Sequence, residues 1–174
     1  MTTLYLAGGC FWGVQKFFDQ FDAVQETQTG YANGRTEAPT YEEVCWQDTG
    51  HAETVKVTFD ETKKSVQDLL ADYFLIIDPL SINRQGFDAG TQYRTGIYYD
   101  DPALLPDIQA AWDREAARIG QPLAVEILPL ANFSPAEPYH QKYLDRFPTG
   151  YCHIKPWLLS LEARRKRAAR QPRK

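Results

Sequence analysis

The sequence has few cysteine, methionine and histidine residues: among its 174 residues are three cysteines, one methionine and three histidines. The cysteines are odd in number, stand far apart and form no Cys-x-x-Cys pair. This pattern argues against a disulfide scaffold or a zinc finger. The sequence also lacks a run of about eighteen apolar residues, which excludes a membrane-spanning helix, and it lacks a secretion signal. We therefore expect a cytoplasmic protein without membrane association.

Positive charge is scarce outside the C-terminus. The net charge is −4, yet residues 162–174 contain seven Lys or Arg residues and only one acid, Glu162. The rest of the chain is correspondingly acidic, which argues against nucleic-acid binding. We expect residues 161–174 to form a basic, disordered tail.

No internal repeat or low-complexity linker interrupts residues 3–160, so we predict a single domain over residues 1–160. Segments with strand and helix periodicity follow one another, which predicts an α+β fold with helices packed on a sheet. Beyond residue 132 the chain is proline-rich, and we expect a long irregular C-terminal arm over about 132–160. The expected strands are 4–7, 24–31, 51–60, 93–99 and 123–127, and the expected helices begin near residues 11, 40, 65, 102 and 139.

Cys10 lies where the first expected strand turns into a helix, in the segment GGCFWG (8–13). Backbone N–H groups and the helix dipole at this position favour a thiolate, and the glycines let a substrate approach the sulfur. Phe11 and Trp12 supply an apolar wall beside it. A nucleophile and a buried structural cysteine both fit this position.

Glu53 shares the face of strand 51–60 that carries Val55, Val57 and Phe59. Burial on this inward face without a cationic partner would raise the pKa of the carboxyl group, making it a neutral acid near pH 7. If the strand begins only at Thr54, Glu53 lies in a solvated loop instead. His51 has the same parity and fits either a base or a structural histidine.

The other two cysteines differ in context. Cys45 lies on an expected short helix whose start, Thr40 to Glu43, has capping-box spacing, and we expect it to be buried. Cys152 lies in the irregular arm, where a mobile backbone could bring its thiol to another cysteine. An incidental free thiol also fits that position.

Five ordered motifs resemble those of the A-type peptide methionine sulfoxide reductases. The first is Gly9-Cys10-Phe11-Trp12-Gly13. The others lie in the segments 30–45 (GYANG and PTYEEVC), 49–53 (TGHAE), 84–94 (RQGFDAGTQYR) and 139–152 (YHQKYL and GYC). Together they extend from residue 4 to about 155, nearly the whole chain except the basic tail. The resemblance implies a two-layer α/β sandwich similar to a ferredoxin-like plait.

The resemblance also implies a set of catalytic residues. Cys10 would be the nucleophile, and Glu53 would protonate or hydrogen-bond the sulfoxide oxygen, helped by the hydroxyl groups of Tyr41 and Tyr93. A sulfoxide sulfur becomes electrophilic as its oxygen gains a proton, so an acid facing the oxygen and a thiolate facing the sulfur suit this chemistry. Cys152 would then resolve the Cys10 sulfenic acid as a disulfide.

The implied binding residues are Phe11 and Trp12 for the substrate methyl group and Asp88 for the polar end of the pocket. The implied substrate is methionine S-sulfoxide, free or in proteins, and thioredoxin would reduce the disulfide. The reaction needs no cofactor and no metal, and we expect a monomer.

The sequence departs from the family pattern at three places. Phe87 stands where Asn is usual, beside Asp88, which affects the local polar network. Ile77 replaces a common His before an Asp-Pro pair, and its place on an apolar helix face indicates a packing change. After Cys152, the segment 153–156 (HIKP) replaces the small residues often seen.

Two other functions fit parts of the sequence. A cysteine hydrolase or acyltransferase would use Cys10 with His51 or His140 as the base, and would not need Cys152. A non-catalytic module would bind methionine side chains with Phe11 and Trp12 and would not turn over.

Overall fold

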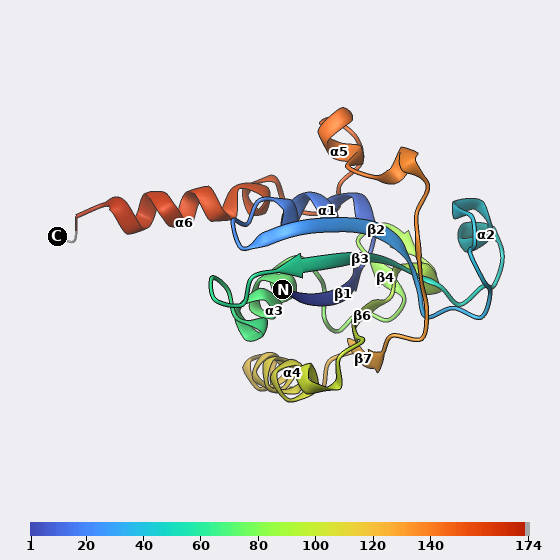
Figure 1. Cartoon of the computed structure of the whole chain (residues 1–174), viewed down its shortest axis with the longest axis horizontal. Helices are drawn as coiled ribbons and strands as arrows, with labels where there is room; N and C mark the ends of the chain where they lie inside the picture. Colours follow the sequence, from blue (N-terminus) through green and yellow to red (C-terminus); the bar gives the residue numbers. More distant parts are fainter. Residues whose placement is uncertain (173–174) are drawn as a thin grey trace.

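The computed structural model describes residues 1–172, and a six-stranded sheet forms its centre (Figure 1). Its strands are β1 (Thr2–Gly8), β2 (Val24–Ala32), β3 (Ala52–Phe59), β6 (Thr95–Tyr99), β7 (Glu126–Pro129) and β8 (Phe133–Pro135). Their order across the sheet is β7-β6-β1-β3-β2-β8. Only the β6–β7 pair in this sheet is parallel; the other neighbours are antiparallel. The fold is mixed α/β with a central sheet, as the alternation of the sequence predicts.

The helices, except the short α5, share one apolar core with a single face of this sheet. They are α1 (Phe11–Asp19), α2 (Tyr41–Trp46), α3 (Val66–Leu75), α4 (Leu105–Ile119), α5 (Tyr143–Arg146) and α6 (Leu161–Arg170). In the core, Leu6 and Val57 from the sheet meet Phe17 of α1 and Leu70 of α3. The opposite face carries a smaller cluster around Tyr5 and Tyr98, joined by Phe133. The first core therefore fixes which face of β3 is buried against helices.

Local sequence signals set the helix starts near the site. Thr40 and Glu43 form the expected capping box of α2, with the Thr40 hydroxyl accepting the Glu43 N–H at 3.1 Å. Ser65 likewise accepts the N–H of Asp68 at the start of α3, which ends at Leu75, two residues earlier than its apolar pattern. Both expected helices are confirmed.

The arm beyond residue 132 has more regular structure than expected. It contains β8, which pairs with β2, a 3₁₀ helix at Pro138–His140 (η3), the short helix α5 and a second 3₁₀ helix at Pro156–Ser160 (η4). The side-chain amide of Gln141 bonds the backbone N–H and C=O of Thr29 on β2. Such contacts between distant residues are not readable from local sequence, which explains the difference.

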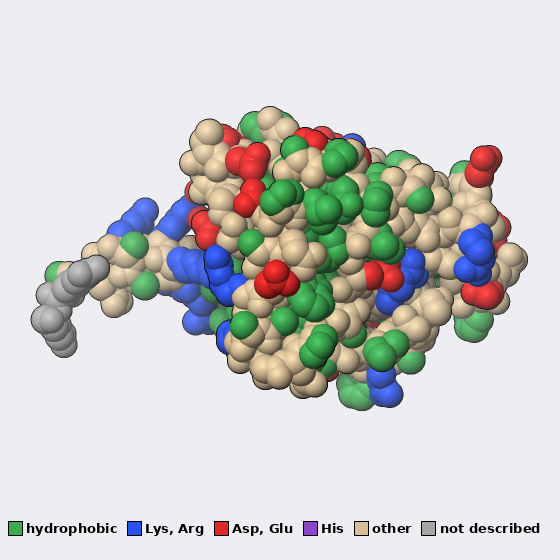
Figure 2. All heavy atoms as spheres, turned by 90° about the horizontal axis from the view of Figure 1, so that it is seen from below, with side chains coloured by type: hydrophobic (Ala, Val, Ile, Leu, Met, Phe, Trp, Pro, Cys, Tyr) green, Lys and Arg blue, Asp and Glu red, His purple; other side chains and the backbone are tan. Residues whose placement is uncertain are grey.

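The basic C-terminal segment differs from the disordered tail that its composition predicts. Residues 161–170 form α6, which projects from the body in Figure 1 and gathers Lys and Arg side chains around it in Figure 2. Its first half is anchored, because Arg165 makes two bonds of 3.0 and 2.8 Å to the buried carboxylate of Asp72. Gln20 also accepts the N–H of Glu162. Residues 173 and 174 of the expected tail lie outside the described residues.

Within residues 1–172, none of the helices is both long enough and apolar enough to cross a bilayer.

Candidate active site

Cys10 and Glu53 meet where β1 ends and α1 begins. Cys10 is the residue before the helix, and its neighbour Phe11 donates its backbone N–H to Glu53 Oε1 at 3.1 Å. Glu53 lies one residue into β3 on the face of Val55 and is only 1% exposed. The buried alternative for Glu53 is therefore the one observed. The carboxyl group is held by the same helix start that carries the thiol.

Burial, opposed by the Phe11 N–H and aided by the nearby charge of Asp88, raises the pKa of Glu53 to about 8. The acid is thus neutral over most of the range below pH 8, as the strand parity predicts. Its second oxygen, Oε2, is buried and has no hydrogen-bond partner among residues 1–172. A protonated carboxyl group with one free position is suited to donate to an oxygen atom of a bound substrate.

The structure differs from the thiolate that the helix start favours at Cys10, because the thiol is buried. Burial raises the pKa of the Cys10 thiol well above its ordinary value, and the Glu53 carboxylate adds to the rise. The backbone of Trp12 acts in the opposite direction, as a helix start should, but it does not overcome the loss of solvent. Cys10 is therefore a protonated thiol at neutral pH, and attack by its sulfur would require that proton to leave.

Tyr41 and Tyr93 surround Glu53 from two other elements. Tyr41 begins α2, and Tyr93 ends a 3₁₀ helix at Thr91–Tyr93 (η1). Burial raises the pKa of both phenols, and the charge of Glu53 raises both further. Both hydroxyl groups consequently stay protonated at neutral pH and are available as hydrogen-bond donors.

Trp12 is held in a stack of rings. Its indole stacks on Tyr143 with ring centroids 3.7 Å apart, and its Nε1–H donates to His140 Nδ1 at 3.1 Å. Trp12 lines a cavity of about 580 Å³ together with Tyr41 and His140. Phe11 does not line this cavity, because it is buried behind it against Tyr31 and His140. Of the two residues expected at the methyl pocket, only Trp12 faces open space there.

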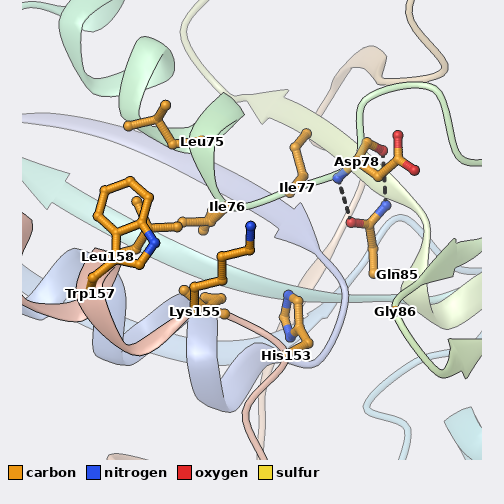
Figure 3. A pocket seen from close by; sticks show the side chains of 11 residues that line it. Leu75, Ile76, Ile77, Asp78, Gln85, Gly86, His153, Lys155, Trp157 and Leu158 are labelled. Carbon is orange, nitrogen blue, oxygen red and sulfur yellow. Dashed lines mark hydrogen bonds between the residues drawn. The ribbon is translucent and has the colours of Figure 1, made fainter.

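Asp88 lies on a tight hairpin of β4 (Arg84–Gln85) and β5 (Asp88–Ala89). The hydroxyl group of Tyr151 donates to Asp88 Oδ2 at 2.9 Å, which joins the hairpin to the arm. The side-chain amide of Gln85 fixes the hairpin to Asp78 (Figure 3): its oxygen accepts the Asp78 N–H at 2.8 Å, and its nitrogen donates to the Asp78 carbonyl oxygen at 3.0 Å. The cavity in that figure, about 340 Å³, lies behind the hairpin and includes His153.

Cys152 lies against the first turn of α1. Its Sγ is 2.9 Å from the position that a Cβ on Gly13 would occupy, so the missing side chain of Gly13 makes room for the thiol. Cys152 is half-buried. All three cysteines, Cys10, Cys45 and Cys152, are free thiols. The Cys152 sulfur contributes to the rise of the Cys10 thiol pKa, as expected for a group close to it.

The remaining residues singled out in the sequence have packing roles. His51 is buried, with Nε2 2.7 Å from the carbonyl oxygen of Thr36, and His140 is bonded to the Trp12 indole. Ile77 packs so closely on β1 that a Cβ at Gly8 would lie 2.8 Å from its Cγ2. Cys45 is half-buried and not fully buried as expected.

Sequence reasoning missed Glu137 as part of the site. Its carboxylate accepts the Tyr31 hydroxyl at 2.8 Å and the backbone N–H of Tyr41 at 3.0 Å, so it positions the start of α2. The only local signal was its place two residues before a recognised motif. Among residues 1–172, no cluster of three or more His, Cys, Asp or Glu side chains could hold a metal ion.

Comparisons with known proteins agree with this geometry. The model of the family described as "Peptide methionine sulfoxide reductase" matches residues 2–171. A protein of Clostridium acetobutylicum, named peptide methionine sulfoxide reductase MsrA, is 51% identical over 159 residues, which is 91% of this chain and 98% of that protein.

Two solved structures are also similar. The reduced form of Mxr1 from Saccharomyces cerevisiae has a TM-score of 0.83 at 34% identity, covering 88% of this chain and 90% of that one. Methionine sulfoxide reductase A of Corynebacterium diphtheriae has a TM-score of 0.77 at 37% identity, covering 87% and 77%. The buried acid, the thiol at the helix start and these matches together show that this chain belongs to the peptide methionine sulfoxide reductase family.

Proposed function

We propose that this chain reduces methionine S-sulfoxide, free or within proteins, to methionine, and so acts as a thiol-dependent repair enzyme against oxidation. The observation that carries the proposal is Glu53. It is an acid that stays neutral at pH 7, with one oxygen that has no hydrogen-bond partner in the described part of the chain, and it is bonded to the N–H of the residue that follows Cys10. The stereochemical preference rests on family membership alone.

The first step is the reduction of the sulfoxide. The Cys10 sulfur attacks the sulfoxide sulfur while Glu53 gives its proton to the sulfoxide oxygen, with Tyr41 and Tyr93 donating hydrogen bonds. The oxygen ends on Cys10 as a sulfenic acid, the substrate sulfur gains two electrons, and the Cys10 proton restores Glu53. Trp12 forms the apolar side that receives the methyl group, Phe11 lies buried behind that cavity, and Asp88 holds the polar end.

The second step regenerates the enzyme. The Cys152 thiol attacks the Cys10 sulfenic acid, which forms a disulfide and releases water. The position of Cys152 beside Gly13, one helix turn from Cys10, supports this role. A thioredoxin dithiol then reduces the disulfide by exchange, since it is the more reducing couple. We propose that the enzyme works as a cytoplasmic monomer.

The fold supports a finer description. The antiparallel order β6-β1-β3-β2, with α1 after β1 and α3 after β3, is the order of a ferredoxin-like plait. We therefore interpret residues 1–160 as one catalytic domain built on that plait, with the resolving cysteine on the arm 132–160. Residues 161–174 form a basic segment outside it.

The deciding experiment is a turnover assay with a methionine S-sulfoxide peptide and dithiothreitol, followed by mass spectrometry of the peptide. The wild-type protein should form methionine, and Cys10→Ser should form none. A chain that forms no methionine would refute the proposal.

The same assay separates the alternatives. A cysteine hydrolase would cleave thioester substrates and leave the sulfoxide intact, whereas a binding module would retain the peptide without converting it. His140 is hydrogen-bonded to Trp12 and His51 to Thr36, which argues against either histidine as the base for Cys10.

A further inference from the structure

Two large aromatic side chains stand in solvent beside the site. Trp46 is 86% exposed and Phe87 is 93% exposed, the highest values among the large hydrophobic side chains of the described chain. Single exposed apolar residues are normal on a protein surface. These two, however, line the same cleft of about 390 Å³, together with Tyr41, Tyr93 and Asp88. An apolar pair around one hollow indicates a binding surface.

The cleft is continuous with the candidate active site. Three of its lining residues, Tyr41, Tyr93 and Asp88, have roles in the proposed reaction. Tyr41 also lines the cavity that contains Trp12, so the two hollows are neighbours that share Tyr41 in their walls. If a polypeptide placed its oxidised methionine side chain between the two hollows, the residues next to that methionine would lie over the hollows.

The two hollows differ in chemistry. The Trp12 cavity includes the carboxylates of Glu42 and Glu137. The Trp46–Phe87 cleft has Asp88 as its one charged residue, and that carboxylate already accepts the Tyr151 hydroxyl. A large apolar side chain is therefore favoured in the second hollow and not in the first.

The backbone that carries each aromatic residue is held by neighbouring contacts. Phe87 is at the tip of the β4–β5 hairpin, after Gly86 with its positive φ of 59°, and Gln85 clamps this hairpin to Asp78 (Figure 3). Trp46 is the last residue of α2, whose first turn is held by its capping box. Aromatic side chains on such supports lose little conformational entropy when they bind.

We propose that Trp46 and Phe87 form a subsite for the residue next to the oxidised methionine, and that this enzyme prefers polypeptides in which that neighbour is a large apolar residue. The preference rests on the proposed function and names its substrate class. Methionines with apolar neighbours are typical of protein cores, so such substrates become accessible on unfolding.

The test compares steady-state kinetics on three substrates: N-acetyl methionine sulfoxide amide, a pentapeptide with Phe on both sides of the sulfoxide, and the same pentapeptide with Gly in place of Phe. The variants are Trp46→Ala and Phe87→Ala. Trp157→Ala, on an exposed aromatic residue outside this cleft, is the matched control.

We expect wild type to have a lower KM for the Phe peptide than for the Gly peptide. Each cleft variant should raise the KM for the Phe peptide about tenfold, the loss expected when one aromatic contact is removed. In both cleft variants, the kcat for the Phe peptide and the kcat and KM for the amide should stay near the wild-type values. The Trp157→Ala enzyme should have wild-type kcat and KM values for all three substrates.

Equal KM values for the two peptides in wild type would overturn the subsite, as would KM changes in the variants that are the same for all three substrates. Failure of the proposed function looks different, because wild type would then convert none of the substrates. Both variants remove exposed side chains, and unaltered thermal unfolding would show that the fold is intact.

Discussion

The acid–thiol pair and the second cysteine are supported in different ways. Glu53 and Cys10 are held by a central strand and a helix start, both nearly inaccessible to solvent. Cys152 lies in a stretch without helix or strand, between α5 and η4, and is half-buried. Within residues 1–172, its Sγ has one hydrogen-bond partner, the carbonyl oxygen of Ile154 at 3.7 Å.

This difference matches the two steps of the proposed reaction. Reduction of the sulfoxide needs an acid and a sulfur atom fixed on opposite sides of one bond, which favours rigid elements. Disulfide formation and reduction need the sulfur atoms to approach and then become accessible to a partner, which favours a movable segment. The comparison predicts that substitutions in the two regions affect different steps.

The largest effect should come from Cys152→Ser. This variant should lose thioredoxin-supported turnover, because its Cys10 sulfenic acid has no partner thiol, yet it should still form methionine in a single turnover. Quenched-flow measurement of methionine, with trapping of the sulfenic acid by dimedone, checks both parts. Cys45→Ser is the matched control and should keep full turnover. A disulfide that still forms in Cys152→Ser would assign the resolving role to Cys45.

The second largest effect should come from a substitution in the acid–thiol pair. Glu53→Gln should slow the single-turnover step by about 10²–10⁴-fold, the usual contribution of a positioned general acid. Disulfide formation from a chemically generated sulfenic acid should not change. A Glu53→Gln enzyme with the full rate at neutral pH would contradict the acid role.

The raised pKa of Glu53 also gives a pH dependence with a definite sign. Because the folded pKa is about 8 and the unfolded value is lower, the folded state holds the proton more tightly. The rate of the first step should therefore fall as pH rises through about 8, and stability should decline as pH rises from the unfolded pKa toward 8. Glu53→Gln should remove the decline and raise the melting temperature at pH 8, which a pH series of thermal unfolding measures.

The positions of Glu53 and Cys10 were largely predictable from the sequence, and the direction of the Cys10 pKa was not. The parity of β3 placed Glu53 on the buried face, and the glycines with helical spacing placed Cys10 at a helix start. Both depend on local periodicity. The direction of the Cys10 pKa depends instead on how much solvent the assembled fold excludes, and here burial outweighed the helix dipole.

Contacts between distant segments account for the other differences. The stack of Trp12 on Tyr143 joins residues from α1 and the arm, and the Gln85 clamp on Asp78 orients the hairpin that carries Asp88. The helix in residues 161–170 is anchored by Asp72 of α3. No local pattern reveals such partners, because each becomes a neighbour only in the folded chain.

A smaller effect should come from Gly13→Ala, at the point where the two regions touch. The added Cβ would lie 2.9 Å from Cys152 Sγ and 3.1 Å from Ile154 Cδ1, so the arm must shift. Overpacking of about 1–3 kcal/mol is usual, and one tenth of the rate corresponds to about 1.4 kcal/mol. We therefore expect disulfide formation to slow about tenfold, measured as loss of free thiols, with an unchanged single turnover. Equal slowing of both steps would break the proposed division.

The smallest effect on catalysis should come from Arg165→Ala, which tests how locally the arm is positioned. Arg165 on α6 binds Asp72 of α3, which also pairs with Lys64 at 2.7 Å, so the Asp72 carboxylate keeps one partner after the substitution. The guanidinium is about half exposed, and its loss should cost about 1 kcal/mol of unfolding free energy, measurable by urea denaturation. If Gly13 and its neighbours set the place of Cys152, disulfide formation should be unchanged, since α6 begins only after the arm ends. A slowing as large as that of Gly13→Ala would instead show that the anchoring of α6 holds the arm in place, and the movable region would then extend to residue 170.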